Sequence, residues 1–334
     1  MKAIAYQTAH DLNDNVGLTD ITLPMPTPQP NDLLVEIRAV SVNPVDTKVR
    51  KRASAANDEW KVLGWDAAGV VKAVGENVTD FKIGDHVWYA GDINRQGSNA
   101  EFQTVDSRIV SRMPTSLSFA QAAAMPLTTI TAWELLFDRI KVDQTCTDAI
   151  VIIGAAGGVG SMMIQLLRQF TQLTIIATAS RPDTIAWVSE LGAHHVINHH
   201  QLLSDELNRL GVAEVRYVVS LNNTDQHVAQ IAQIIAPQGQ FALIDDPIAV
   251  DFTLFKRKSV SIHWESMFTR STFMTPDLAE QGRVLAKVAD LVDAGHLRTT
   301  MTQELGTINA ENIKRAHKWL ESGVSIGKVV LAGF

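Results

Sequence analysis

The sequence predicts an α/β protein of two domains, one largely β and one built on a doubly wound parallel sheet. With 334 residues, the chain exceeds the usual size of a single hydrophobic core. Hydrophobic residues make up 46% and charged residues 19%, which is typical of a globular protein. Short strands and turns fill the first third, whereas strands and helices alternate from about Phe119, the pattern of a helix-covered parallel sheet.

The β part is marked by turn residues and by prolines. Glycine-containing turns are expected at 75–77 and 84–85. Four prolines between positions 24 and 30 predict an extended connector, because proline lacks the N–H that a strand needs. The expected strands are 2–6, 33–42, 68–74, 86–88 and 100–105.

The alternating part begins with a helix at 119–136 that is interrupted near Pro126. The apolar, β-branched run 149–154 predicts a central strand buried on both faces, followed by a helix at 158–170. Further strands are expected at 173–179, 195–197, 215–220, 240–244 and 260–264, with helices at 183–191 and 228–235. The tail, with helices 278–294 and 310–322 and strand 328–332, is expected to rejoin the first domain. The predicted domains are therefore 1–123 with 264–334, and 124–263.

Charge and cysteine content exclude several classes of function. The formal net charge is −7 with no long basic run, so nucleic acid is not an expected partner. A single cysteine, Cys146, excludes intrachain disulfides and multi-cysteine zinc sites. No apolar segment has the length of a membrane span and the start does not resemble a signal peptide, so a cytosolic location is expected.

A glycine-rich turn joins the predicted strand 149–154 to the helix that follows. It has the pattern A-x-G-x-x-G, in which Gly157 lets the backbone approach a pyrophosphate and Gly160 lets helix and strand pack closely. The anion would meet unpaired N–H groups and the positive end of the helix dipole. The glycines alone also fit an ordinary turn, but in this context they predict a dinucleotide site. Its expected residues are Ala155, Gly157, Gly158, Val159 and Gly160.

The end of the next strand favours NADPH over NADH. An NAD-specific site places an acidic residue about twenty positions on, for the ribose hydroxyl. Here Ser180 and Arg181 stand at that point, and an arginine pairs with a 2′-phosphate in a bidentate manner. Asp183 follows Pro182 and is expected to begin a helix. The alternative for Arg181 is an exposed side chain without a ligand.

Sequence fragments along nearly the whole chain resemble the medium-chain dehydrogenase/reductase superfamily, and its quinone oxidoreductase branch in particular. They are Ser41-Val42-Asn43-Pro44-Val45-Asp46, Gly64-Trp65-Asp66-Ala67-Ala68-Gly69, Val74-Gly75, Gly84-Asp85-His86-Val87, Pro126-Leu127-Thr128, Thr131-Ala132, the turn at 155–160, Leu191-Gly192-Ala193 and Gly327-Lys328-Val329-Val330-Leu331. The resemblance implies a β-rich GroES-like catalytic domain, formed by both chain ends, and a Rossmann cofactor domain. It also implies an active site in the cleft between them and, by analogy, a homodimer.

The zinc ligands of the family's alcohol dehydrogenases are absent. Their positions fall on Asn43, Trp65 and Leu127, and the acidic position falls on Asp66. Indole and aliphatic side chains cannot ligate zinc, and an amide is a poor substitute for a thiolate. The stretch between Trp88 and Phe102 also lacks the cysteines of a structural zinc lobe. We expect no metal. Histidines at 194, 195, 199 and 200 could bind one, but a solvated loop near the adenosine is the preferred interpretation.

Loss of the metal favours an acceptor that needs little polarisation. Without a Lewis acid, developing alkoxide charge needs another stabiliser, and a quinone or other conjugated carbonyl is an easier acceptor. The resemblance thus implies hydride transfer from NADPH to such a compound, with the enzyme mainly orienting the reactants. Two alternatives remain: an NADPH-dependent ketone or aldehyde reductase, and a non-catalytic NADPH-binding sensor or structural protein.

Several further residues are candidates for the site. Asn43 is the first choice for a polar group near the nicotinamide or the substrate oxygen, with a turn cap before Pro44 as its alternative. Asp46 is a candidate catalytic residue and Thr128 a candidate cofactor contact, and either could instead be a structural tie. Trp65, Trp88 and Tyr89 could line an aromatic pocket or belong to the core, and Tyr89 is a possible proton donor in competition with water. The cofactor candidates are Asn222, Ile244 and Asp245 at strand ends, and Lys328, whose alternative is an exposed lysine. The segment 263–275 has no assigned role.

Overall fold

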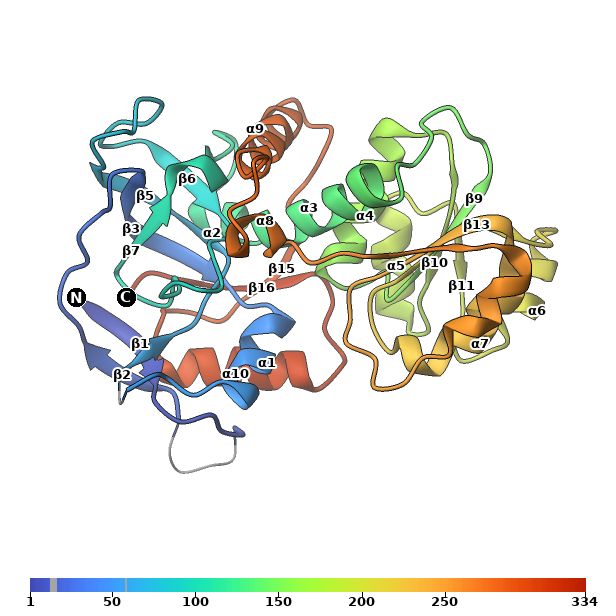
Figure 1. Cartoon of the computed structure of the whole chain (residues 1–334), viewed down its shortest axis with the longest axis horizontal. Coiled ribbons are helices and arrows are strands. Elements are labelled where there is room, and N and C mark those ends of the chain that lie inside the picture. Colours follow the sequence, from blue (N-terminus) through green and yellow to red (C-terminus); the bar gives the residue numbers. More distant parts are fainter. Residues whose placement is uncertain (13–16, 58) are drawn as a thin grey trace. The chain divides into compact units, whose positions relative to one another are not determined.

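The computed structural model describes residues 1–12, 17–57 and 59–334. The chain forms two compact units, Met1–Ile130 with Phe268–Phe334, and Thr131–Met267 (Figure 1). The predicted boundaries after residues 123 and 263 lie seven and four positions before the observed ones at 130 and 267. In the described ranges, no helix combines the length and the apolar character required to cross a bilayer.

The first unit is built on a seven-stranded sheet to which both ends of the chain contribute. Its order is β15 (Met301–Glu304), β16 (Lys328–Ala332), β3 (Asp32–Ser41), β5 (Ala67–Val74), β6 (His86–Tyr89) and β8 (Val110–Arg112), with β7 (Phe102–Asp106) also paired to β3. Figure 1 shows β16, in red, within this sheet. It pairs antiparallel to β3 with Val330 opposite Ser41. A smaller sheet contains β2 (Thr19–Thr22), β1 (Lys2–Tyr6) and β4 (Lys61–Val62).

Helix α1 (Pro44–Arg52) begins directly after β3 and was not predicted from the sequence. Its buried positions are Asp46, Thr47 and Arg50, so its inner face lacks the apolar periodicity that marks an amphipathic helix. The helix packs against α10 (Ala310–Glu321), where the buried Arg50 guanidinium pairs with Glu321. Other helical segments here are α2 (Phe119–Ala123), α3 (Pro126–Trp133), α8 (Thr269–Thr272) and α9 (Glu280–Asp293).

The second unit contains a six-stranded, fully parallel sheet. Its order is β11 (His195–Ile197), β10 (Thr174–Thr178), β9 (Ala149–Ile153), β12 (Val215–Ser220), β13 (Ile235–Leu243) and β14 (Ser261–Trp264). Helices α4 (Gly158–Phe170), α5 (Pro182–Glu190), α6 (Leu203–Arg209) and α7 (Thr224–Ile234) connect its strands. The order reverses between β9 and β12, and ligands of doubly wound folds bind at the carboxyl ends of strands at such a switch point. The predicted α/β architecture is confirmed.

The burial of β9 explains its continuous apolar sequence. Ile150, Val151, Ile152 and Ile153 are each at most 1% exposed, as expected for a strand covered on both faces.

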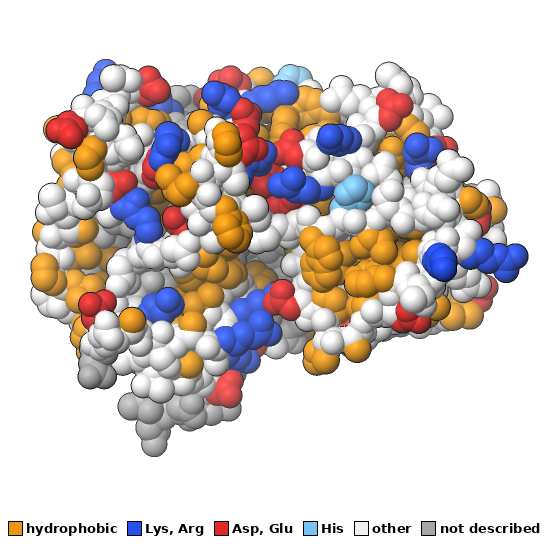
Figure 2. Space-filling model, in the orientation of Figure 1, with side chains coloured by type: hydrophobic (Ala, Val, Ile, Leu, Met, Phe, Trp, Pro, Cys, Tyr) orange, Lys and Arg blue, Asp and Glu red, His pale blue; other side chains and the backbone are white. Residues whose placement is uncertain are grey.

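Helix 119–136 was predicted as one interrupted element. It is instead α2, α3 beginning at Pro126, and a π-helical turn at Glu134–Arg139. On the face shown in Figure 2, basic and acidic side chains are interspersed.

Candidate functional site

The turn after β9 can be built only with a glycine at its first position. Gly154 has φ +79°, and a Cβ atom there would lie 2.5 Å from the Asn222 Oδ1. The Gly154 N–H donates to the Thr178 Oγ1 at 3.2 Å. The hydrogen bond links the carboxyl ends of β9 and β10, and the absence of a Cβ atom lets Asn222, which follows β12, lie close to the turn. Asn222, predicted near the cofactor, therefore lies at the switch point of the sheet.

Gly157 and Gly160, at the start of α4, are needed for different reasons. A Cβ atom on Gly160 would approach the Ala155 carbonyl oxygen to 2.4 Å, so close packing of the helix on the turn requires glycine there. A Cβ atom on Gly157, the N-cap, would meet nothing nearer than the Gly154 oxygen at 3.5 Å. Protein atoms therefore do not explain Gly157, whereas a ligand approaching the backbone would. Residues 156–159 are partly exposed, and the first N–H groups of a helix lack partners within it.

Ser180 and Arg181 follow the second strand, β10, as expected for a cofactor-discriminating segment. Arg181 is the N-cap residue of α5 and its side chain is 37% exposed. Its Nε lies 3.3 Å from the Asp183 Oδ1. Asp183 is in the first turn of α5, where the sequence placed it, and is 61% exposed. Ser180 and Arg181 are both partly exposed, so a hydroxyl residue and a guanidinium residue stand side by side in the sequence at this strand end.

Asp245, which follows β13, has a role within the protein. Its Oδ2 accepts a hydrogen bond from the Thr224 backbone N–H at 2.9 Å, and its Oδ1 accepts one from the Thr224 hydroxyl. The carboxylate therefore caps the start of α7. Ile244 stands between β13 and this capping residue and contributes no polar side chain.

The histidines after α5 do not form a metal site in the described part of the chain, where no three His, Cys, Asp or Glu side chains are grouped to hold an ion. The rings of His199 and His200 are 4.4 Å apart, and His227 on α7 is 6.3 Å from His199. Burial, then the neighbouring histidines and Arg181, lower the pKa of His199. Arg168 contacts His194, which in turn accepts from the Ile175 N–H at 2.9 Å.

Asn43 and Leu127, at two of the three positions aligned with zinc ligands, belong to a buried polar network with Asp66. The Asn43 Nδ2 donates to the Asp66 Oδ2 at 2.8 Å, and the other oxygen of Asp66 accepts from the Leu127 N–H at 2.7 Å. The Lys328 ammonium lies 3.0 Å from the Asp66 Oδ2 and also donates to the Asn43 Oδ1 and, at 2.7 Å, to the Val42 carbonyl. Lys328 is 4% exposed, so the exposed-lysine interpretation does not hold.

Asp46 adds a second carboxyl group to this region. It is fully buried, and its Oδ2 accepts from the Asn43 backbone N–H at 2.7 Å at the start of α1. Burial raises the pKa of Asp46 to about 7, against the opposing effects of the Asn43 N–H and Lys328. Burial also raises the pKa of Asp66 and lowers the pKa of Lys328. Asp46 is therefore a structural tie to Asn43 whose charge state is easily perturbed.

These residues do not fit a zinc ion. The Trp65 Nε1 donates to the Asp92 carbonyl at 3.2 Å, and the Leu127 side chain has no donor atom. Asp66 is already neutralised by an ammonium group, which would repel a dication. The donor set and the buried charge thus both disagree with a metal at this point.

Trp65, Trp88 and Tyr89 are core residues, each at most 1% exposed, and their predicted pocket role needs correction. The Tyr89 hydroxyl donates to the Gln103 Oε1 at 2.9 Å, and burial raises the pKa of Tyr89 well above its usual value. Tyr89 is therefore poorly suited to donate a proton to a substrate. The Thr128 hydroxyl donates to the Met125 carbonyl at 3.0 Å, where it ties α3 to the segment before it.

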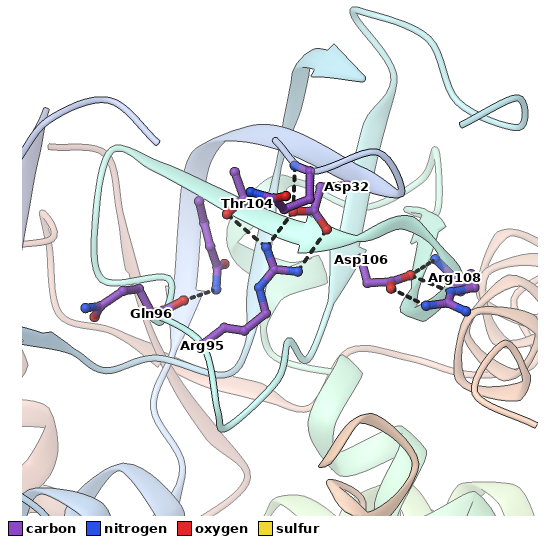
Figure 3. A network of polar contacts seen from close by, with 8 residues as sticks. Asp32, Arg95, Gln96, Thr104, Asp106 and Arg108 are labelled. Atoms are coloured by element: carbon purple, nitrogen blue, oxygen red, sulfur yellow. Dashed lines mark hydrogen bonds and ion pairs between the residues drawn. The ribbon is translucent and has the colours of Figure 1, made fainter. Parts of the chain in front are cut away.

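An arginine that the sequence did not mark fixes the stretch where the family's structural zinc lobe would occur. The Arg95 guanidinium makes two parallel hydrogen bonds to Asp32, at 2.9 and 2.6 Å, and a third to the Thr104 Oγ1 at 3.1 Å (Figure 3). The Gln103 Nε2 donates to the Gln96 carbonyl at 2.9 Å. Side-chain hydrogen bonds thus help to tie the loop to β3 and β7. No local pattern identifies Arg95, because its partners lie on separate strands.

The segment 263–275, to which the sequence assigned no role, begins at the end of the edge strand β14. Glu265 has a fully buried side chain, and its Oε2 accepts from the Arg139 Nε at 2.7 Å. Arg139 ends the π-helical turn. Trp264 is 52% exposed. The segment is therefore anchored by an ion pair within the second unit.

Comparison with known proteins identifies the family. Residues 29–126 match the alcohol dehydrogenase GroES-like domain, and residues 191–331 match the zinc-binding dehydrogenase family. A zinc-type alcohol dehydrogenase-like protein of Staphylococcus aureus is 37% identical over 99% of this chain and 99% of its own length. The chain therefore belongs to the medium-chain dehydrogenase/reductase superfamily of oxidoreductases, among its zinc-type alcohol dehydrogenase-like proteins, and the predicted GroES-like and Rossmann domains are confirmed.

Other relatives carry differing descriptions. A solved structure from Rhizobium etli, described as a putative zinc-dependent alcohol dehydrogenase, is 56% identical with a TM-score of 0.97, covering 100% of this chain and 98% of that one. The quinone oxidoreductase of Coxiella burnetii is 27% identical with a TM-score of 0.81, over 100% and 99%. Human mitochondrial NAD(P)H oxidoreductase RTN4IP1 is 29% identical over 90% of this chain and 82% of its own length.

Proposed function

We propose that this protein is an NADPH-dependent reductase that transfers hydride to quinones or other conjugated carbonyl compounds without zinc. The observation that carries the proposal is the network of Asn43, Asp66 and Lys328, which has an amide at one zinc-ligand position and pairs the adjoining acidic residue with an ammonium group. The relationship to a quinone oxidoreductase and to an NAD(P)H oxidoreductase supports it.

Cofactor binding would use the turn after β9 and the end of β10. The backbone of 157–160 and the N-terminus of α4 would hold the pyrophosphate, because their N–H groups and the helix dipole favour an anion. Ser180 and Arg181 would contact the 2′-phosphate. Asn222, beside Gly154, would border the cofactor at the switch point.

Reduction of a conjugated carbonyl compound needs little acid catalysis by the protein. When bound, NADPH supplies the hydride. Conjugation in the acceptor spreads the resulting negative charge, which lowers the demand for a metal or a strong acid. Asn43 is the candidate for orienting the reactants, since its amide is fixed in the network. Because Tyr89 is committed to Gln103, water is the proposed proton source for the product.

Steady-state oxidation of NADPH with three acceptors tests this function. An ortho-quinone and an enone should be reduced, and a saturated ketone should not. Turnover of the ketone would favour an ordinary carbonyl reductase, and tight NADPH binding without any turnover would favour a sensor. Metal analysis of the purified protein is the second arm: one tightly bound zinc per chain, with activity lost on its removal, would contradict the zinc-free mechanism.

A substitution at Arg181 tests the proposed preference for NADPH over NADH. Arg181→Gln should raise the KM for NADPH roughly tenfold or more, the loss expected for a charge-assisted phosphate contact, and leave the KM for NADH nearly unchanged. Arg209→Gln, on the exposed end of α6, is a matched control. Equal effects of Arg181→Gln on both cofactors would contradict a 2′-phosphate contact. The homodimer and the cytosolic location stay predictions.

A further inference from the structure

The Lys328 ammonium group makes all of its hydrogen bonds within the protein. It has three N–H bonds and three acceptors: the Val42 carbonyl, the Asn43 Oδ1 and the Asp66 carboxylate. The side chain is 4% exposed and that of Asp66 is 0% exposed. Lys328 therefore has no proton left for a substrate or cofactor, and any influence on the reaction must act through its three partners.

The ammonium group also determines which way the Asn43 amide points. An ammonium can only donate, so the Asn43 atom that faces it must be the oxygen. The amide nitrogen is then directed at the Asp66 Oδ2, 2.8 Å away. Among the residues that the structure describes, the only other acceptor of that nitrogen is the Ser41 carbonyl at 3.5 Å, which is too long for a strong bond. The Asp66 carboxylate can only accept, so Lys328 and Asp66 select the same amide orientation, and both must be replaced to release it.

The network joins the segments that would carry zinc ligands. Asn43 ends the link from β3 to α1, Asp66 precedes β5, and the Leu127 N–H that binds Asp66 lies in the first turn of α3. Lys328 reaches them from β16, which pairs with β3. A metal in such a place brings ligands from separate segments together and supplies positive charge. Here one lysine does both.

We propose that Lys328 takes over the electrostatic and positioning role of the family's catalytic zinc: it neutralises Asp66, orients Asn43 together with that carboxylate and holds these segments together. The inference rests on the zinc-free function proposed above. Lys328 is accordingly a positioning residue, and its loss should affect the hydride-transfer step more than cofactor binding.

The first experiment compares Lys328→Met with Lys328→Arg. Lys72→Met is the matched control, because Lys72 forms an ion pair with Glu36 but is 41% exposed. Kinetics with the quinone should show a fall in kcat on the order of 100-fold for Lys328→Met, the effect typical of losing a preorganised polar group. The KM for NADPH should change less than about threefold, a primary isotope effect from 4-deuterated NADPH should increase, and Lys328→Arg should recover part of kcat. Unchanged kcat and isotope effect in folded Lys328→Met would overturn the inference.

A double variant covers the case in which Lys328→Met does not fold. Asp66→Asn combined with Lys328→Met removes the unpaired buried charge, so this protein should fold and still have low kcat, because Asn43 is no longer oriented. Wild-type kcat in the double variant would refute the positioning role.

A measurement that does not depend on turnover separates the two proposals. The side-chain NH₂ signals of Asn43 in a ¹⁵N correlation spectrum, assigned by their loss in Asn43→Asp, should shift and exchange faster with solvent in the double variant. If the wild type reduces no acceptor, the proposed function fails. If the Asn43 signals are the same with and without Lys328, the lysine inference fails, whatever the activity.

Discussion

Two ion pairs in the first unit lie where the sequence resemblance predicts the zinc sites of alcohol dehydrogenases, and they are built differently. Lys328 and Asp66 occupy the region of the catalytic metal, with side chains 4% and 0% exposed. Arg95 and Asp32 fasten the stretch of the structural lobe, with side chains 30% and 3% exposed. The first pair uses a point charge shared among three acceptors. The second uses a planar fork that binds one carboxylate twice.

The difference in burial determines what each pair contributes. Two charges removed from water are costly, and breaking such a pair by removing one partner leaves the other charge uncompensated. A pair that keeps access to solvent loses less, because water can replace the missing partner. Loss of Lys328 from the buried pair should therefore strongly lower the stability of the protein. The partly exposed pair of Arg95 and Asp32 should stabilise only the loop.

The largest expected effect is on Lys328. Lys328→Met should lower the free energy of unfolding by about 3–5 kcal/mol, the range for breaking a buried ion pair. Urea unfolding followed by circular dichroism measures it. Adding Asp66→Asn should recover part of the loss, because it removes the stranded carboxylate. A loss below about 1 kcal/mol would mean that water or a rearrangement solvates Asp66, and the contrast between the two pairs would disappear.

Sequence reasoning predicted that the zinc ligands are missing, but it did not predict the lysine network. Asn43, Trp65 and Leu127 are recognisable because motifs around them fix their alignment. Lys328 was predicted to lie near the cofactor, with an exposed lysine as the alternative. Only the pairing of β16 with β3 shows that it contacts Asn43, 285 positions earlier in the sequence. No period in the local sequence encodes that register.

Local patterns predicted the second unit better than the first. Three elements have the predicted bounds: the strands His195–Ile197 and Val215–Ser220 and the helix Gly158–Phe170. They could be predicted because the apolar pattern of each element lies within consecutive residues. Helix α1 was missed because charged side chains fill its buried face, and Tyr89 was misjudged because its partner Gln103 lies on another strand.

Removing Arg95 should have the next largest effect. Arg95→Met leaves the Asp32 carboxylate, 3% exposed, with the Gln29 N–H at 3.1 Å among its remaining contacts. The expected loss is about 1–3 kcal/mol, as for an unsatisfied buried acceptor. Because the loop is distinct from the Lys328 network, kcat of the folded protein should stay within about twofold of wild type. A large fall in kcat without loss of stability would show that the two regions are coupled.

The pH dependence of the Arg95 effect sharpens the comparison. Burial raises the pKa of Asp32, but hydrogen bonds from Arg95 and the Gln29 N–H outweigh it and hold the pKa below 3.8. A carboxyl group whose pKa is lowered by folding stabilises the protein above its unfolded pKa, and this contribution is lost as pH falls through the folded value. The stability difference between wild type and Arg95→Met should thus be full at pH 7 and shrink as pH falls below about 4. Unfolding titrations from pH 7 to pH 3 would reveal a constant difference if Asp32 were not the responsible group.

The smallest effect is expected at Arg108, which pairs with Asp106 close to Arg95 in Figure 3. Both members lie on one short segment, and Arg108 is 42% exposed, so the pair closes no long-range contact and is well solvated. Arg108→Met should therefore change the free energy of unfolding by less than about 1 kcal/mol, and the difference should decline with added salt. The same urea experiment in low and high salt measures both. Arg108→Met could instead lower the free energy of unfolding as much as Arg95→Met. Exposure would then not explain the difference between these ion pairs, and the bidentate bond from Arg95 to β3 would have no special role in stabilising the loop.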